Sequence, residues 1–235
     1  MLNPCTGQAW QGAARGRRKQ GASLIELMVG VTVGLLIVGS AIGLFASHLT
    51  SSTQLMFSAR LNQELRAAAE VVVRDLRRAS YWQNAIQGTI AVGSGSATTA
   101  NPYKAVTSAS GSVYYGFSRD TTENDVLDST ETFGFRLTDT GVLEMQTAQG
   151  TWVAMTDLNL VRVTAFTVTP TVTSLALGDL CPTTCAIGSP NCPTSSVRRF
   201  DVLLRGESAR DSTLVRELRM AVRLRNDRLD GQCPA

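Results

Sequence analysis

Residues 17–28 read Arg17-Arg18-Lys19-Gln20-Gly21-Ala22-Ser23-Leu24-Ile25-Glu26-Leu27-Met28, a basic run that ends in glycine and opens into an apolar segment carrying one carboxylate. From Leu27 to Ser47 the chain has 21 residues without a charge. A helix of that length crosses about 30 Å of hydrocarbon at ~1.5 Å per residue. This segment is therefore predicted to span a membrane.

Basic residues flank this segment on one side only. Arg15, Arg17, Arg18 and Lys19 precede it, whereas the next Lys or Arg after it is Arg60. Because the cytoplasmic flank of a span carries the excess of Lys and Arg, the N-terminus is predicted to be cytoplasmic. The rest of the chain is then expected outside the cytoplasm.

Glu26 lies at the start of the apolar segment, where a carboxylate in lipid needs a partner. The segment fits an ordinary secretory signal poorly, because such a signal ends at a small-x-small cleavage site. If the chain is cut between Gly21 and Ala22, the new α-amino group of one subunit can meet Glu26 of a neighbour and neutralise it. Such an assembly salt bridge predicts side-by-side packing of identical or similar helices.

Beyond the span, apolar residues recur at three- and four-residue spacings, which predicts an amphipathic continuation of the helix. These positions are Leu55, Leu61, Leu65, Ala68, Val72, Leu76 and Ala79. The helix is expected to run from about Ser23 to Ala79. The predicted parts are a leader (1–21), a transmembrane half-helix (22–49), an amphipathic half-helix (50–80) and a globular head (81–235).

In the head the apolar period changes to two. Phe133, Phe135 and Leu137 alternate with polar or small residues, and Asp139-Thr140-Gly141 predicts a hairpin loop before a strand at 143–146. Further strands are predicted at 113–118, 151–155, 158–169, 198–206 and 214–225, whereas 87–112 is predicted to be a long connection. The expected fold class is α+β, with a long N-terminal helix packed on one antiparallel sheet.

Four cysteines belong to the head. Cys5 lies in the leader, and Cys181, Cys185, Cys192 and Cys233 remain. An even number in an exported domain indicates two disulfides, and at least one is expected to fix the C-terminal tail. A zinc site is the alternative, although the spacing lacks paired Cys-x2-Cys knuckles. Four cysteines allow three pairings, and the sequence does not choose among them.

Acidic residues crowd the loop before the strand at 133–137. They are Asp120, Glu123, Asp125, Asp128 and Glu131. Their spacing does not match the twelve-residue EF-hand loop, so a solvated acidic loop is the favoured interpretation and calcium binding the alternative. No metal site or cofactor is predicted.

The net charge gives no argument for a nucleic-acid partner. Without residues 1–21 the chain has 18 basic against 19 acidic residues. The arginines of the C-terminal strands alternate with acids, so a mixed-charge solvent face is favoured over a stripe for DNA. Nucleic acid is therefore an unexpected partner.

Catalytic patterns are weak. The single histidine, His48, lies where the predicted helix leaves the bilayer, so Ser-His-Asp and Cys-His arrangements are excluded within the head. No pair of carboxylates stands out from the acidic loop for two-carboxylate chemistry. We expect no enzymatic activity and no catalytic residues.

The segment Gly21-Ala22-Ser23-Leu24-Ile25-Glu26, with its basic leader and span, closely resembles the class III signal of type IV prepilins and type II secretion pseudopilins. Residues 60–81, 128–137 and 222–226 resemble PilW-type minor pilins. The resemblance implies a pilin-like fold, cleavage by prepilin peptidase between Gly21 and Ala22, and N-methylation of Ala22. Ala22 departs from the family, which usually has Phe or Met there.

Minor pilins of this type belong to a tip complex that primes pilus assembly. The resemblance therefore implies initiation of type IV pilus assembly, in support of adhesion or twitching motility. It implies other minor pilins, the major pilin and a large tip adhesin as partners. The expected location is the inner membrane with a periplasmic head, and the pilus tip or fibre after assembly. The alternatives are a J-type pseudopilin of type II secretion and a membrane-tethered periplasmic binding module or enzyme.

Overall fold

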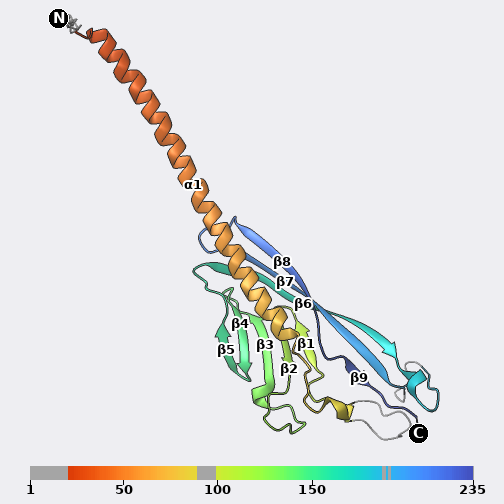
Figure 1. The fold of residues 1–235 in the computed structure, drawn as a ribbon. Helices are drawn as coiled ribbons and strands as arrows, with labels where there is room; N and C mark the ends of the chain where they lie inside the picture. Colours follow the sequence, from red (N-terminus) through yellow and green to blue (C-terminus); the bar gives the residue numbers. More distant parts are fainter. Residues whose placement is uncertain (1–20, 89–98, 187–188, 190–191, 235) are drawn as a thin grey trace, which may run out of the picture. The chain divides into compact units, whose positions relative to one another are not determined.

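The computed structural model describes residues 21–88, 99–186, 189 and 192–234 (Figure 1). It divides into two units, Met1–Ser52 and Thr53–Ala235, which are considered separately below. A single helix, α1 (Leu24–Leu76), begins in the first unit and ends in the second. Predictions that concern residues 1–20 lie outside the described residues.

In the first unit α1 is apolar and exposed. Its large side chains from Leu24 to Leu49 are 52–78% accessible to solvent. The helix is long and apolar enough to cross a membrane. None of the residues in its most apolar stretch is buried against the rest of the chain. Gly30, Gly34 and Gly39 have open space where a Cβ would stand, so this surface can approach another helix closely.

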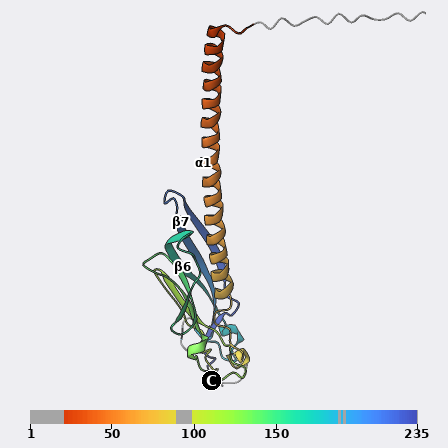
Figure 2. The same ribbon diagram turned by 90° about the vertical axis from the view of Figure 1, so that its left-hand side faces the viewer.

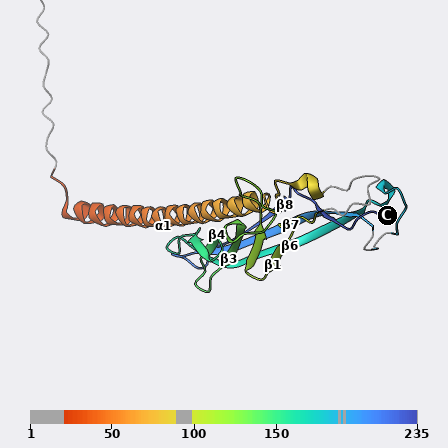
Figure 3. The same ribbon diagram turned by 90° about the horizontal axis from the view of Figure 1, so that it is seen from below.

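In the second unit α1 turns one face onto the head. Leu61, Leu65, Val72 and Leu76 are at most 1% exposed, as their helical spacing predicted. Leu55 is the exception, because it is 71% exposed and does not belong to the buried face. The last turns of α1 lie on the same side of both sheets (Figures 2 and 3).

In the described residues nine strands form two antiparallel sheets. The first sheet has the order β1 (Val106–Ala109), β2 (Ser112–Gly116), β3 (Thr132–Leu137), β4 (Leu143–Ala148) and β5 (Thr151–Ala154). The second has the order β6 (Val161–Ala176), β7 (Thr194–Ser208) and β8 (Val215–Arg223), and β9 (Arg228–Asp230) pairs with β7. Short 3-10 helices lie at Ala85–Gly88, Ser129–Glu131 and Gly178–Leu180.

The α+β class is confirmed, but the prediction of a single sheet is wrong. The first sheet is a meander of neighbours along the chain, whereas in the second β9 pairs with β7 rather than with β8. No strand pairing joins β5 to β6 in the described residues. The two sheets meet instead where the β1–β2 turn and the β3–β4 loop lie against β6. The Gly111 N–H donates to Phe166 O at 3.1 Å, and the Val163 N–H donates to Gly141 O at 2.8 Å. They bury one common core with α1, which includes Leu65, Phe135, Phe166 and Phe200.

Two strands were missed, and two are longer than predicted. β1 lies within the segment predicted as a connection, and β9 lies in the tail. β6 extends past residue 169 to Ala176, where its side chains are mostly exposed, and β7 begins earlier than residue 198 to pair with it. An exposed strand rich in Thr and Ser does not alternate between apolar and polar residues. The extension of β6 and β7 was therefore not recognisable from the sequence pattern. The hairpin loop at Gly141 is confirmed, with φ +90°.

Candidate functional site

Gly21, Ala22 and Ser23 form an exposed, irregular segment directly before α1. The Leu27 N–H donates to Ser23 O at 3.1 Å, so Ser23 accepts the first backbone bond of the helix. A peptide bond outside regular structure and open to solvent can enter the active site of a protease. The bond between Gly21 and Ala22 meets both conditions.

Glu26 lies in the first turn of α1 and is exposed. The spacing Ser23-Leu24-Ile25-Glu26 also matches a capping box, in which a Ser at the helix start is followed three residues later by Glu. An acid in the first turn is favourable toward the positive end of the helix dipole. Glu26 therefore stands where the positive end of the helix dipole favours an acid, a local feature that the sequence prediction did not include.

A second group of polar residues surrounds Glu131 in the head. Glu131 is 0% exposed. Its Oε2 accepts hydrogen bonds from the Tyr103 hydroxyl at 2.9 Å and the Asp128 N–H at 3.1 Å. Its Oε1 accepts from the Arg119 N–H at 2.7 Å. The prediction of a solvated loop is thus wrong for this residue, because the carboxylate is buried and satisfied by neutral donors.

Glu123 and Asp125 fasten the same loop from its other end. The Tyr103 hydroxyl also lies 3.0 Å from Glu123 Oε1, so one phenol bridges two carboxylates. Asp125, with φ +60°, accepts from the Trp82 indole N–H at 2.7 Å. Burial raises the pKa of Glu123, but hydrogen bonds from Ser118, the Asp125 backbone and Tyr103 outweigh it and lower the pKa overall.

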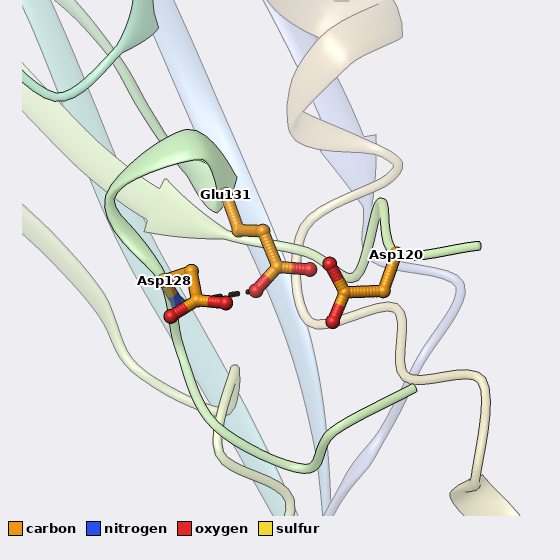
Figure 4. Close-up of side chains that lie close together, drawn as sticks. All are labelled: Asp120, Asp128 and Glu131. Atoms are coloured by element: carbon orange, nitrogen blue, oxygen red, sulfur yellow. Dashed lines mark hydrogen bonds between the residues drawn. The ribbon is translucent and has the colours of Figure 1, made fainter. Parts of the chain in front are cut away.

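Asp120, Asp128 and Glu131 place carboxylate oxygens within 4.8 Å of one another (Figure 4). Desolvation and the charges of Glu131 and Asp128 raise the pKa of Asp120. Both oxygens of Glu131 already accept hydrogen bonds, so protein donors hold the cluster together. The arrangement can order the loop between β2 and β3.

The four head cysteines form two disulfides. Cys181 pairs with Cys233, and Cys185 pairs with Cys192. The first bridge fixes the C-terminal tail, and the second closes a small loop beyond the end of β6. This pairing uses all four sulfur atoms. The sequence left the choice among three pairings open.

Arg198 is buried, so the prediction of a mixed-charge solvent face for the arginines of the C-terminal strands is wrong for this residue. It is 6% exposed, and its guanidinium donates to Lys104 O at 2.6 Å, Ser80 Oγ at 2.8 Å and Asn226 O at 3.1 Å. Burial lowers its pKa. It fastens the turn after α1, where Ser80 has φ +64°, to the segment after β8.

The chain has an apolar helix long enough to cross a membrane, and the second half of this helix packs on antiparallel sheets in the head. This arrangement is pilin-like. The profile of a family described as PpdB, prepilin peptidase-dependent protein B, matches residues 54–224, and the chain belongs to this family. The family is related to the type IV pilus, and its description supports prepilin peptidase as a partner. No curated protein and no solved structure matches the chain significantly.

Proposed function

We propose that this protein is a minor pilin of the PilW type, which helps to initiate type IV pilus assembly within a tip complex. The observation that carries the proposal is the exposed apolar part of α1, preceded by Gly21 and Ala22 and joined to a head of the PpdB family. Apolar side chains this exposed have to be covered by lipid or by other helices. Lateral packing in a filament covers them after the helix leaves the membrane.

In this proposal prepilin peptidase cleaves between Gly21 and Ala22, and Ala22 is then N-methylated. The matched family region begins at residue 54, so these roles rest on the signal sequence and on the exposure of its residues. Glu26 accepts the new amino group of a neighbouring subunit, which removes the cost of an unpaired carboxylate in an apolar environment.

The proposed location before assembly is the inner membrane, with the head in the periplasm, and the pilus tip or fibre afterwards. Two disulfides in the head suit an oxidising compartment. The proposed partners are other minor pilins, the major pilin and a large tip adhesin. The protein acts by assembly rather than catalysis, in support of adhesion or twitching motility.

The first test is the N-terminus of the mature protein, determined by mass spectrometry. A start at Ala22 supports processing by prepilin peptidase, and loss of that start in a strain without the peptidase makes the assignment specific. A mature chain that begins elsewhere, or is uncut, argues for an ordinary membrane-tethered module.

The second test separates cleavage from assembly. Glu26→Val is expected to be cleaved normally but to reduce the number of pili, because the amino group of the neighbour loses its partner. Glu70→Val is a matched control, since Glu70 is an exposed carboxylate of the head part of α1. Normal piliation in the Glu26 variant would refute the salt-bridge account.

Loss of secretion with normal pili in a deletion strain would favour the J-type pseudopilin.

A further inference from the structure

A small basic pocket lies at the C-terminal end of α1, next to the segment after β8 that Arg198 fastens. Its volume is about 250 Å³, and its lining is Arg77, Arg78, Tyr81, Phe117, Ser118, Arg225 and Asn226. Three of these residues are arginines and none is acidic. The pocket brings together the end of α1 and the segment after β8, two regions that the sequence analysis singled out separately.

Arg78 forms one ordered wall of the pocket. Its guanidinium lies 4.3 Å from the centroid of the Phe117 ring, which is 3% exposed. Asp75 accepts from Arg78 at 3.2 Å and from the Tyr115 hydroxyl at 2.5 Å. Arg78 is therefore held in place by a stacked ring and a buried acid.

Arg77 and Arg225 start from adjoining backbones, because the Arg225 N–H donates to Arg77 O at 3.3 Å. Both side chains are exposed. Within the described part of the chain neither guanidinium makes a hydrogen bond or an ion pair. Two cations that share a pocket without a lining carboxylate repel each other, so the fold itself gains nothing from their proximity.

Basic residues near a helix end are often explained by the exposed carbonyl groups there. Here backbone donors already satisfy these carbonyls. The O atoms of Val73, Asp75 and Leu76 accept from the N–H groups of residues 77, 78 and 79 at 2.9–3.1 Å. The O atoms of Arg77 and Arg78 accept from the N–H groups of residues 225 and 81 at 3.3 and 3.1 Å. Capping therefore leaves the guanidinium groups of Arg77 and Arg225 available.

We propose that this pocket binds an oxyanion, a carboxylate or a phosphate group, held by the guanidinium groups of Arg77 and Arg225. Arginine presents its donors as a planar fork that matches two oxygens of either group. The Tyr81 hydroxyl in the lining adds a neutral donor. The Ser118 hydroxyl already donates to Glu123, and the Phe117 ring is covered by Arg78. The proposal is independent of the role in pilus assembly.

The direct test labels arginines of the full chain in detergent micelles with a phenylglyoxal reagent and locates the adducts by tandem mass spectrometry. Inorganic phosphate is added at constant ionic strength, with chloride as the reference. Labelling of Arg77 and Arg225 is expected to fall several-fold with phosphate. Arg74 is the internal control, because it is exposed on the last turn of the same helix but does not line the pocket.

A parallel arm with acetate distinguishes the two sources of the anion. If both acetate and phosphate protect Arg77 and Arg225 from labelling, the pocket binds carboxylates as well as phosphates. If phosphate alone protects them, it is a phosphate site. Either result supports the pocket. Equal protection of all three arginines, or no protection by either probe, would overturn it.

Variants test the geometry through the thermal shift that the same anion produces. A ligand that binds only the folded state raises the melting temperature by an amount that grows with the logarithm of one plus the ratio of ligand concentration to Kd, so the shift reports the affinity. Arg77→Gln with Arg225→Gln is expected to weaken the apparent affinity for phosphate about tenfold or more, since both charged donors are lost. Arg74→Gln, which removes one charge from the same turn, should leave the affinity unchanged. Arg225→Lys keeps the charge but loses the fork, so it should bind less tightly than the parent chain. An unchanged affinity in the double variant would also refute the proposal.

Discussion

Loss of the Cys181–Cys233 bridge is expected to cost more stability than loss of the Cys185–Cys192 bridge. The first joins residues 52 apart in sequence, and the second joins residues 7 apart. A cross-link restricts the unfolded chain, and the effect grows with the length of the closed loop. For these lengths the chain-entropy expression gives about 4.1 kcal/mol for the first bridge and about 2.4 kcal/mol for the second. The expected difference is therefore about 1.8 kcal/mol.

Two double variants make the comparison, Cys181→Ser with Cys233→Ser and Cys185→Ser with Cys192→Ser. With Cys5→Ser in every chain, replacing both partners leaves no free thiol to exchange with the other bridge. The free energy of unfolding is measured by urea titration of the full chain in detergent micelles, followed by near-ultraviolet circular dichroism. The slope is fitted separately for each variant, because loss of a cross-link expands the unfolded chain and changes the surface exposed on unfolding.

The tail bridge has a second effect that the short bridge lacks. It follows β9, whose Asp230 and Leu229 pair with Thr194 and Ser195 of β7, so its loss also frees that strand. Equal losses of stability in the two double variants, or a larger loss for the short loop, would contradict the pairing. Non-reducing peptide mapping of the parent chain then identifies which cysteines are joined.

Three further substitutions probe the head. Glu131→Ala should lower the free energy of unfolding by about 3 kcal/mol or more, because the Tyr103 hydroxyl and two backbone N–H groups lose a buried acceptor; a loss below 1 kcal/mol in urea titration would show that the site is open to water. Asp120→Asn should raise the melting temperature at pH 7 and have no effect at pH 3: its folded pKa is raised, so the stability of the protonated form is lost as the pH rises through that pKa. A stabilisation that persists at pH 3 would contradict the charge explanation. Gly134→Ala should destabilise by about 1–3 kcal/mol, because a Cβ there would lie 2.7 Å from Val113 O; an unchanged melting temperature would mean that β2 and β3 adjust without cost.

The spacing of apolar residues predicted the helix and strands that bury one face in the core and expose the other. The helical spacing of Leu61, Leu65, Val72 and Leu76 identified the buried face of α1, because one side of that helix meets the sheets. Alternation at Phe133 and Phe135 identified β3 for the same reason. Leu55 obeyed the spacing and is nevertheless exposed. A pattern thus predicts which face can be buried, whereas contact with the head decides how far along the helix burial extends.

The acidic loop shows where a pattern of charges misleads. Asp120 and Glu131 are equally acidic in the sequence, yet Glu131 is fully buried and Asp120 is partly exposed. The difference depends on Tyr103, which lies 28 residues from Glu131 and brings a buried hydroxyl to its carboxylate. Sequence spacing within the loop contains no information about that donor. The basic pocket has the same origin, because Arg77 and Arg225 meet only when β8 packs beside the end of α1.

The amino-acid sequence by itself determined the exposed, membrane-length apolar helix and the α+β class. These features depend on composition and spacing within one segment, where solvent, lipid and backbone geometry act locally. The tertiary structure alone decided the division into two sheets, the pairing of the cysteines and the burial of Glu131. Each of these depends on groups distant along the chain, and their contacts form only when burial of the common core offsets the loss of chain entropy.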